Sequence, residues 1–137
     1  MPLTLDTNIL VRLATRDDPV QAEAALRVLR AADRLVIPLP VWCELARVPL
    51  RGYRHSAKQV AHAIGTLMDV EQVVCDREAV RAGLAMLAAG ADFADGVIAR
   101  AGVQMGADAM LTFDRTAAAR PSSVLGLKAV VPPGEET

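Results

Sequence analysis

The 137-residue sequence predicts an α/β domain with a mainly parallel sheet. Short apolar segments alternate with longer segments of helical periodicity along the chain, which is the pattern of consecutive β–α units. With 53% hydrophobic and 23% charged residues, the composition is that of a folded globular protein rather than a disordered one. The sequence contains no convincing linker, so we expect one domain over residues 1–131 and a frayed tail over 132–137.

The first part of the chain predicts two strands and three helices. Pro19 suits a first helical turn and therefore begins a helix, whereas the residue before Pro49 disfavours helix and ends one. Apolar residues that recur every three or four positions define the inward helix faces. The expected strands cover residues 3–6 and 35–37, and the expected helices cover about 7–14, 19–32 and 41–48.

The second part of the chain follows a loop expected over residues 49–55. Ser56 can cap a helix whose inward face carries Val60, Ala63, Ile64 and Leu67. Gly90 separates two further helices from each other. The expected helices cover about 56–68, 77–89 and 93–105, and the expected strands cover 73–75, 109–113 and 127–131.

The bulk properties exclude several classes of protein. A net charge of −1 provides no general basic field for nucleic acid. The sequence has no run of 18 apolar residues, so we expect no membrane span. The first apolar run is interrupted by Asp6, Asn8 and Arg12, whereas the apolar region of a signal peptide is continuous. Cys43 and Cys75 lack the spacing of a zinc site, so we expect free thiols and a cytoplasmic protein.

Two aspartates close apolar strands. Asp6 follows Leu3-Thr4-Leu5, and Asp114 follows Leu111-Thr112-Phe113. Ligand sites of open α/β sheets lie beyond the carboxyl ends of the strands, which makes both residues candidates for chemistry. Each also has a plainer explanation, because Asp6 can be a helix N-cap and Asp114 can be a turn residue beside Arg115.

Three more acids occur on expected helices. Glu44 is three residues after Val41 and four before Val48, so we expect it on or beside an apolar face, compensated by a metal ion or by an arginine. Asp92 and Asp95 open a helix, where both could simply complement the helix dipole.

Together these positions predict a metal site. Strand ends and the following helix starts meet at one edge of a parallel sheet, so the carboxylates can converge there. Several carboxylates share a small pocket only when divalent cations neutralise their repulsion, and oxygen-only ligands favour Mg²⁺ or Mn²⁺. Thr7, Asn8 and Thr112 are polar neighbours that could orient the acids or a bound water.

The same residues resemble the motifs of PIN domains, in that family's order. The resemblance rests on Asp6-Thr7-Asn8 after a strand, Glu44 before Leu45, Asp92-Phe93-Ala94-Asp95 with Ile98-Ala99, and Thr112-Phe113-Asp114-Arg115, and it spans residues 3–131. The compact chain resembles the VapC-type toxins within the family. One departure is Gly96, where many relatives have a helix former, and we expect it to leave the site intact.

The resemblance implies a three-layer α/β/α fold and Mg²⁺-dependent hydrolysis of RNA phosphodiester bonds. It assigns metal ligation and catalysis to Asp6, Glu44, Asp95 and Asp114, with Asp92 as an accessory residue. It also implies a toxin that is blocked by a separate antitoxin protein and pairs as a homodimer.

Our mechanistic hypothesis is that a metal-activated water attacks phosphorus in line, with Asp6 and Asp95 holding the principal ion. The two histidines, His55 and His62, are expected away from the acidic edge. Phosphates of the RNA are expected to contact a basic segment that lacks acids, through Arg47, Arg51, Arg54 and Lys58.

Two other functions remain open on the sequence. A catalytically inactive module would keep the fold and bind RNA or protein. An aspartyl-phosphate phosphatase also begins with Asp at a strand end, but it needs a second Asp two residues later, and here that residue is Asn8.

Overall fold

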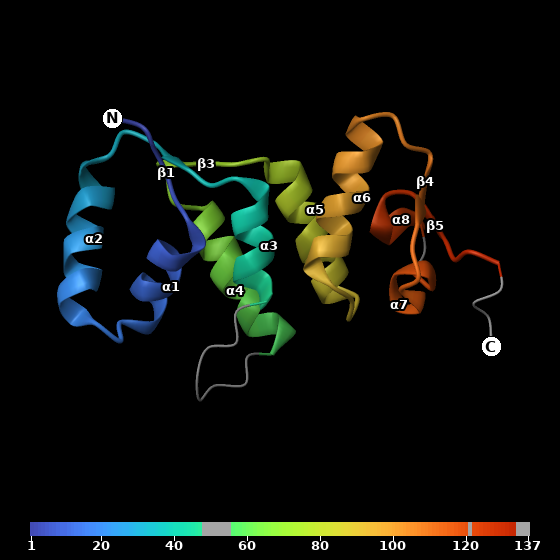
Figure 1. Ribbon diagram of the computed structural model, residues 1–137, viewed down its shortest axis with the longest axis horizontal. Helices are drawn as coiled ribbons and strands as arrows, with labels where there is room; N and C mark the ends of the chain where they lie inside the picture. Colours follow the sequence, from blue (N-terminus) through green and yellow to red (C-terminus); the bar gives the residue numbers. More distant parts are fainter. Residues whose placement is uncertain (48–55, 121, 134–137) are drawn as a thin grey trace. The chain divides into compact units, whose positions relative to one another are not determined.

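The computed structural model describes residues 1–47, 56–120 and 122–133 (Figure 1). The chain forms two compact units, Met1–Asp76 and Arg77–Thr137, and each is described here by itself. The expected loop over 49–55 lies outside the described residues, as does the tail beyond Pro133. The single domain over 1–131 therefore stays a prediction.

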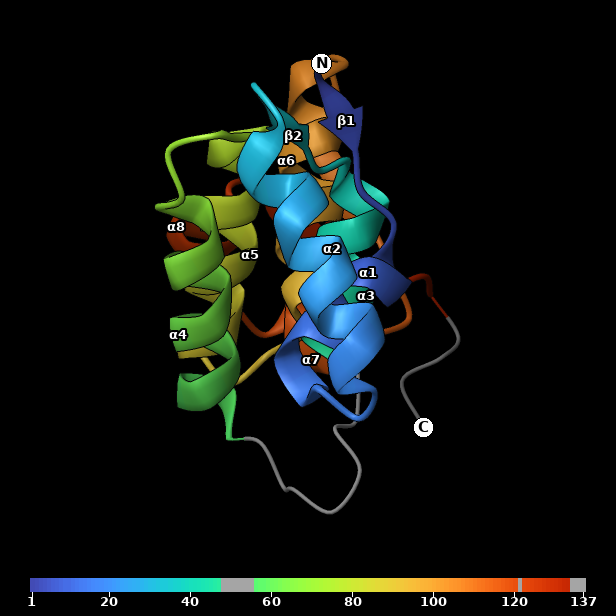
Figure 2. The ribbon, with the colours of Figure 1, turned by 90° about the vertical axis from the view of Figure 1, so that its left-hand side faces the viewer.

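The first unit contains a three-stranded parallel sheet in the order β1-β2-β3. Leu3 pairs with Leu35, and Leu35 pairs with Val73, so the strands are in register across the sheet. Helices α1 and α2 lie side by side (Figure 2). The elements of this unit are β1 (Leu3–Thr4), α1 (Thr7–Thr15), α2 (Pro19–Ala31), β2 (Leu35–Val36), α3 (Leu39–Arg47), α4 (Ala57–Met68) and β3 (Val73–Val74).

Side-chain caps define where these helices begin. The Asp6 carboxylate accepts the Ile9 N–H at 3.1 Å and caps α1. Asp18 caps α2 directly before Pro19. Ser56 and Gln59 form a reciprocal capping box at the start of α4. Helix α3 begins two residues earlier than expected, because Pro40 is compatible with a first helical turn.

Trp42 is the largest fully buried side chain among the described residues of the first unit. Its side chain is fully buried, and its indole N–H donates to the Ile37 carbonyl at 3.0 Å. That hydrogen bond satisfies the one polar group of the ring and ties α3 to the residue after β2. Leu10, Leu29 and Ile64 bring α1, α2 and α4 into the same core.

The second unit contains two long helices, over residues 77–88 and 93–104, and a two-stranded parallel sheet. In this sheet Leu111 is opposite Val130. A buried cluster around Met86, Ala99 and Leu125 holds it together. Two four-residue helices, α7 and α8, were not expected from the sequence. The elements are α5 (Arg77–Ala88), α6 (Phe93–Gln104), β4 (Ala109–Leu111), α7 (Arg115–Ala118), α8 (Ser122–Leu125) and β5 (Lys128–Val130).

The described strands all pair in parallel, and two helices separate each strand from the next along the chain. The predicted α/β class with a mainly parallel sheet is therefore confirmed. None of the described helices is long and apolar enough to cross a membrane.

Candidate active site

Asp6 and Glu44 line one pocket of the first unit, which we call the acid pocket. It has a volume of about 450 Å³. The Thr7 hydroxyl donates a hydrogen bond to the Glu44 carboxylate, and this bond ties the first turn of α1 to α3. The acid pocket is lined by Asp6, Thr7, Asn8, Val11, Val41 and Glu44.

Glu44 is exposed, which corrects the expectation that burial forces a metal ion or an arginine to compensate its carboxylate, and it lines the acid pocket beside Val41. The buried residues of α3 are Val41 and Trp42. Around the helix axis Glu44 is about 200° from Trp42 but only about 60° from Val41, so it lies at the edge of the buried face rather than within it. Its carboxylate therefore needs no arginine to compensate for burial, and the Thr7 hydroxyl and solvent serve it instead.

Asp95 and Asp114 form a second pair, in the second unit. Asp95 lies in the first turn of α6, and Asp114 caps α7. Asp114 accepts the Thr116 N–H at 2.9 Å and the Ala117 N–H at 3.3 Å. The Thr112 hydroxyl oxygen accepts the Asp114 N–H at 2.9 Å, so the polar residue of the motif fixes the backbone of the acid.

The pKa of Asp114 lies below its ordinary value. The Ala117 N–H makes the largest contribution, desolvation acts in the opposite direction, and the hydrogen bond with Asp95 and the Thr116 N–H lower the pKa further. A lowered pKa keeps this carboxylate ionised at neutral pH, and the ionised form is the one that binds cations.

Asp92 is the N-cap of α6 and accepts the Ala94 N–H at 3.2 Å. The capping role considered for Asp92 from the sequence is therefore real. Asp6 and Asp114 are also N-caps. Capping and ligation are compatible because a carboxylate has two oxygens, and the Asp6 cap uses only Oδ1.

The donor chemistry of both pairs suits a hard cation. Every candidate group is a carboxylate, hydroxyl or amide oxygen, the type that Mg²⁺ and Mn²⁺ prefer. Within the described ranges no group of three or more His, Cys, Asp or Glu side chains is close enough to hold a metal ion. Each unit by itself holds one pair of the candidate acids.

The predicted RNA contacts are only partly described. Arg47 is exposed at the end of α3, and Lys58 is exposed in the first turn of α4. Arg51 and Arg54 lie outside the described residues.

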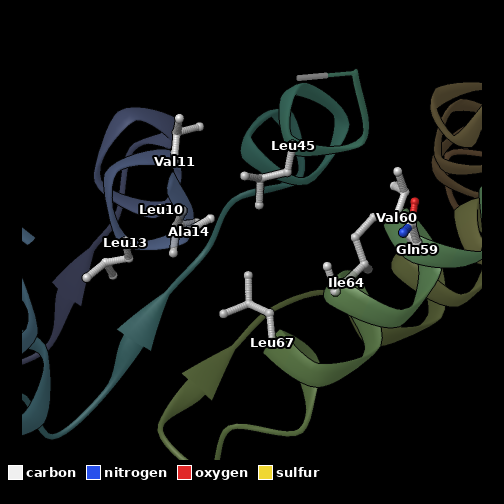
Figure 3. Close-up of a pocket in the computed structure, with 10 residues that line it drawn as sticks. Leu10, Val11, Leu13, Ala14, Leu45, Gln59, Val60, Ile64 and Leu67 are labelled. Carbon is white, nitrogen blue, oxygen red and sulfur yellow. The ribbon is translucent and has the colours of Figure 1, made fainter. Parts of the chain in front are cut away.

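A second, apolar pocket lies beside α1, α3 and α4 of the first unit, with a volume of about 550 Å³ (Figure 3). The α4 residues that the periodicity predicts to face inward all line it. Val11 lines both the apolar pocket and the acid pocket, so the two adjoin. The apolar pocket is lined by Leu10, Val11, Leu13, Ala14, Leu45, Gln59, Val60, Ala63, Ile64 and Leu67.

Comparison with known protein families matches residues 3–121 to the PIN domain, and the chain belongs to this family. No curated protein and no solved structure matches it. Family membership gives the chain a nuclease-like fold and confirms the three-layer α/β/α class, in a family that typically uses divalent metal ions.

Proposed function

We propose that the chain is a Mg²⁺-dependent endoribonuclease whose site comprises Asp6, Glu44, Asp95 and Asp114. The observation that carries this proposal is that the four motif acids fall into two pairs: Asp6 and Glu44 line one pocket, and Asp95 lies close enough to Asp114 to affect its pKa. Neighbouring carboxylates repel each other, and a divalent cation relieves this repulsion.

The chain's own residues have distinct roles in this proposal. Asp6 and Asp95 hold the ion, while Glu44 and Asp114 complete its ligands or orient the attacking water. Thr7 fixes Glu44 by its hydroxyl, and Thr112 fixes the Asp114 backbone. A bound Mg²⁺ supplies the positive charge that counters the phosphate and increases the acidity of water. Arg47 and Lys58 bind phosphates along the RNA.

The test of this proposal is an assay of the purified chain in Mg²⁺ with three substrates: single-stranded RNA, single-stranded DNA and p-nitrophenyl phosphate. A ribonuclease cleaves the RNA. An inactive binding module cleaves none of the three, and an aspartyl-phosphate phosphatase releases p-nitrophenol only. Either of the last two results would contradict the proposal.

We further propose that this ribonuclease is a VapC-type toxin controlled by a separate antitoxin in the cytoplasm. The apolar pocket supports a protein partner, because a helix bound there would lie next to the acid pocket at Val11. The three helices that border the apolar pocket, α1, α3 and α4, carry mainly cationic side chains among their charged residues. These charged residues are Arg12, Glu44, Arg47 and Lys58. An amphipathic antitoxin helix with an acidic polar face has the complementary chemistry.

Expression of the chain alone is expected to arrest bacterial growth, because uncontrolled RNA cleavage stops translation. The purified chain is expected to be a homodimer by light scattering at micromolar concentration. A harmless monomer would contradict the toxin proposal while leaving the ribonuclease proposal intact.

Ala63→Arg tests the apolar pocket as the antitoxin site. Ala63 lines the pocket, so a long charged side chain there is expected to prevent rescue of growth by a co-expressed cognate antitoxin, while growth arrest persists. His62→Arg is the matched control, because His62 is the exposed neighbour that does not line the pocket. Equal rescue of both variants would show that the antitoxin binds elsewhere.

A further inference from the structure

Two glycines bring α5 and α6 into unusually close contact at the point where α6 begins. A Cβ added to Gly96 would lie 2.6 Å from the Ala82 carbonyl carbon and 2.9 Å from the Gly83 Cα, which are backbone atoms of α5. A Cβ added to Gly83 would lie 2.6 to 2.7 Å from three ring carbons of Phe93. We call Ala82, Gly83, Phe93 and Gly96 the glycine crossing.

The two α6 residues of the glycine crossing lie on either side of Asp95 in the sequence. Phe93 precedes the acid by two residues and is fully buried, and Gly96 follows it directly and is buried as well. Asp92 caps the same turn and accepts the Ala94 N–H. The backbone that carries Asp95 is therefore held against α5 on both sides of the acid.

We infer that Gly96 and Gly83 are positioning residues for Asp95 in the proposed metal site. This inference rests on the proposed function. Any side chain at position 96 would meet the α5 backbone, which cannot move aside as a flexible side chain can. Helix α6 would have to shift, and Asp95 would shift with it relative to Asp114. Gly96 is thus a requirement of the site rather than a neutral departure from the family pattern.

The chain offers a matched control within the same helix. Gly102 is also in α6, but a Cβ added there would lie 3.7 Å from the Ala107 Cβ, an ordinary contact. Alanine favours helix equally at both positions, so any difference between Gly96→Ala and Gly102→Ala reflects the crossing rather than helix propensity.

The test measures binding of Mn²⁺ alone by titration calorimetry, together with the melting temperature and RNA cleavage. Gly96→Ala is expected to weaken Mn²⁺ binding and to lower cleavage by about 10²-fold at temperatures where it is fully folded, since small misplacements of catalytic groups have effects of that size. Gly102→Ala is expected to bind Mn²⁺ as the wild type does, with an equal or higher melting temperature.

A second variant covers the case in which Gly96→Ala does not fold. The atoms nearest to a Cβ at Gly83 are carbons of the Phe93 ring, so Gly83→Ala is expected to weaken Mn²⁺ binding. Phe93→Leu in the same chain is expected to restore part of that binding by removing the obstructing carbons. Rescue of this kind distinguishes positioning from general destabilisation.

The outcomes separate the two proposals. A wild-type chain that binds no Mn²⁺ and cleaves no RNA would overturn the proposed function and this inference with it. Wild-type Mn²⁺ binding by a folded Gly96→Ala chain, or by Gly83→Ala without any change at Phe93, would overturn the inference alone.

Discussion

Asp6→Asn is expected to lower RNA cleavage by about 10²-fold or more, the usual effect of removing one strong electrostatic group from an active site. The melting temperature is expected to stay the same or rise. Asparagine caps helices about as well as aspartate, so its amide oxygen can still accept the Ile9 N–H. The change also removes one of the two negative charges of the acid pocket, which relieves its repulsion with Glu44.

Asp18→Asn is the matched control. Asp18 caps α2 as Asp6 caps α1, and its carboxylate accepts the Val20 and Gln21 N–H groups at 3.1 Å. It belongs to none of the acidic motifs, so the variant is expected to cleave RNA normally. Cleavage and melting temperature are measured on the same preparations. Near-normal turnover by Asp6→Asn would show that Asp6 is a helix cap and nothing more.

Chelation is expected to abolish cleavage completely. In the proposed site a cation neutralises the paired carboxylates and EDTA would remove it, so addition of Mg²⁺ or Mn²⁺ is expected to restore activity. Without that cation, the acids of the proposed site repel the RNA phosphates. Cleavage that continues after exhaustive chelation would rule out the metal mechanism.

Thermal unfolding tests whether the chain binds a cation without the use of an RNA substrate. A cation that binds only the folded chain stabilises it by about 2.7 kcal/mol when present at a hundred times its dissociation constant. The melting temperature is therefore expected to rise on addition of Mg²⁺, and this rise is expected to be smaller for Asp6→Asn than for Asp18→Asn. An identical rise for both variants would place the ion away from Asp6.

The fold followed from local signals in the sequence. Pro19 and Ser56 mark helix starts that the structure places within one residue of the expected positions, because proline and capping chemistry act over only a few residues. Helices α7 and α8 were missed because four residues are too few to establish a period.

The sequence predicts the candidate acids, and that assignment stays a prediction, but it predicts their environments only in part. Strand-end positions identified Asp6 and Asp114, whereas spacing alone misjudged the exposure of Glu44, because the buried face of α3 is determined by Trp42 as well as Val41. The positioning role inferred for Gly96 could also not be predicted from the sequence. It depends on the distance to Ala82 in another helix, and no periodicity within α6 reports that distance.

The N-terminal caps of α1 and α7 have a consequence for how this protein can diverge. Asp6 is oriented by an N–H group three residues ahead of it, and Asp114 by N–H groups two and three residues ahead. The direction of each acid is thus encoded within a stretch of four residues. The remainder of each helix can change its sequence without turning the carboxylate, so the chemistry of the site can be inherited while most of the surrounding chain drifts.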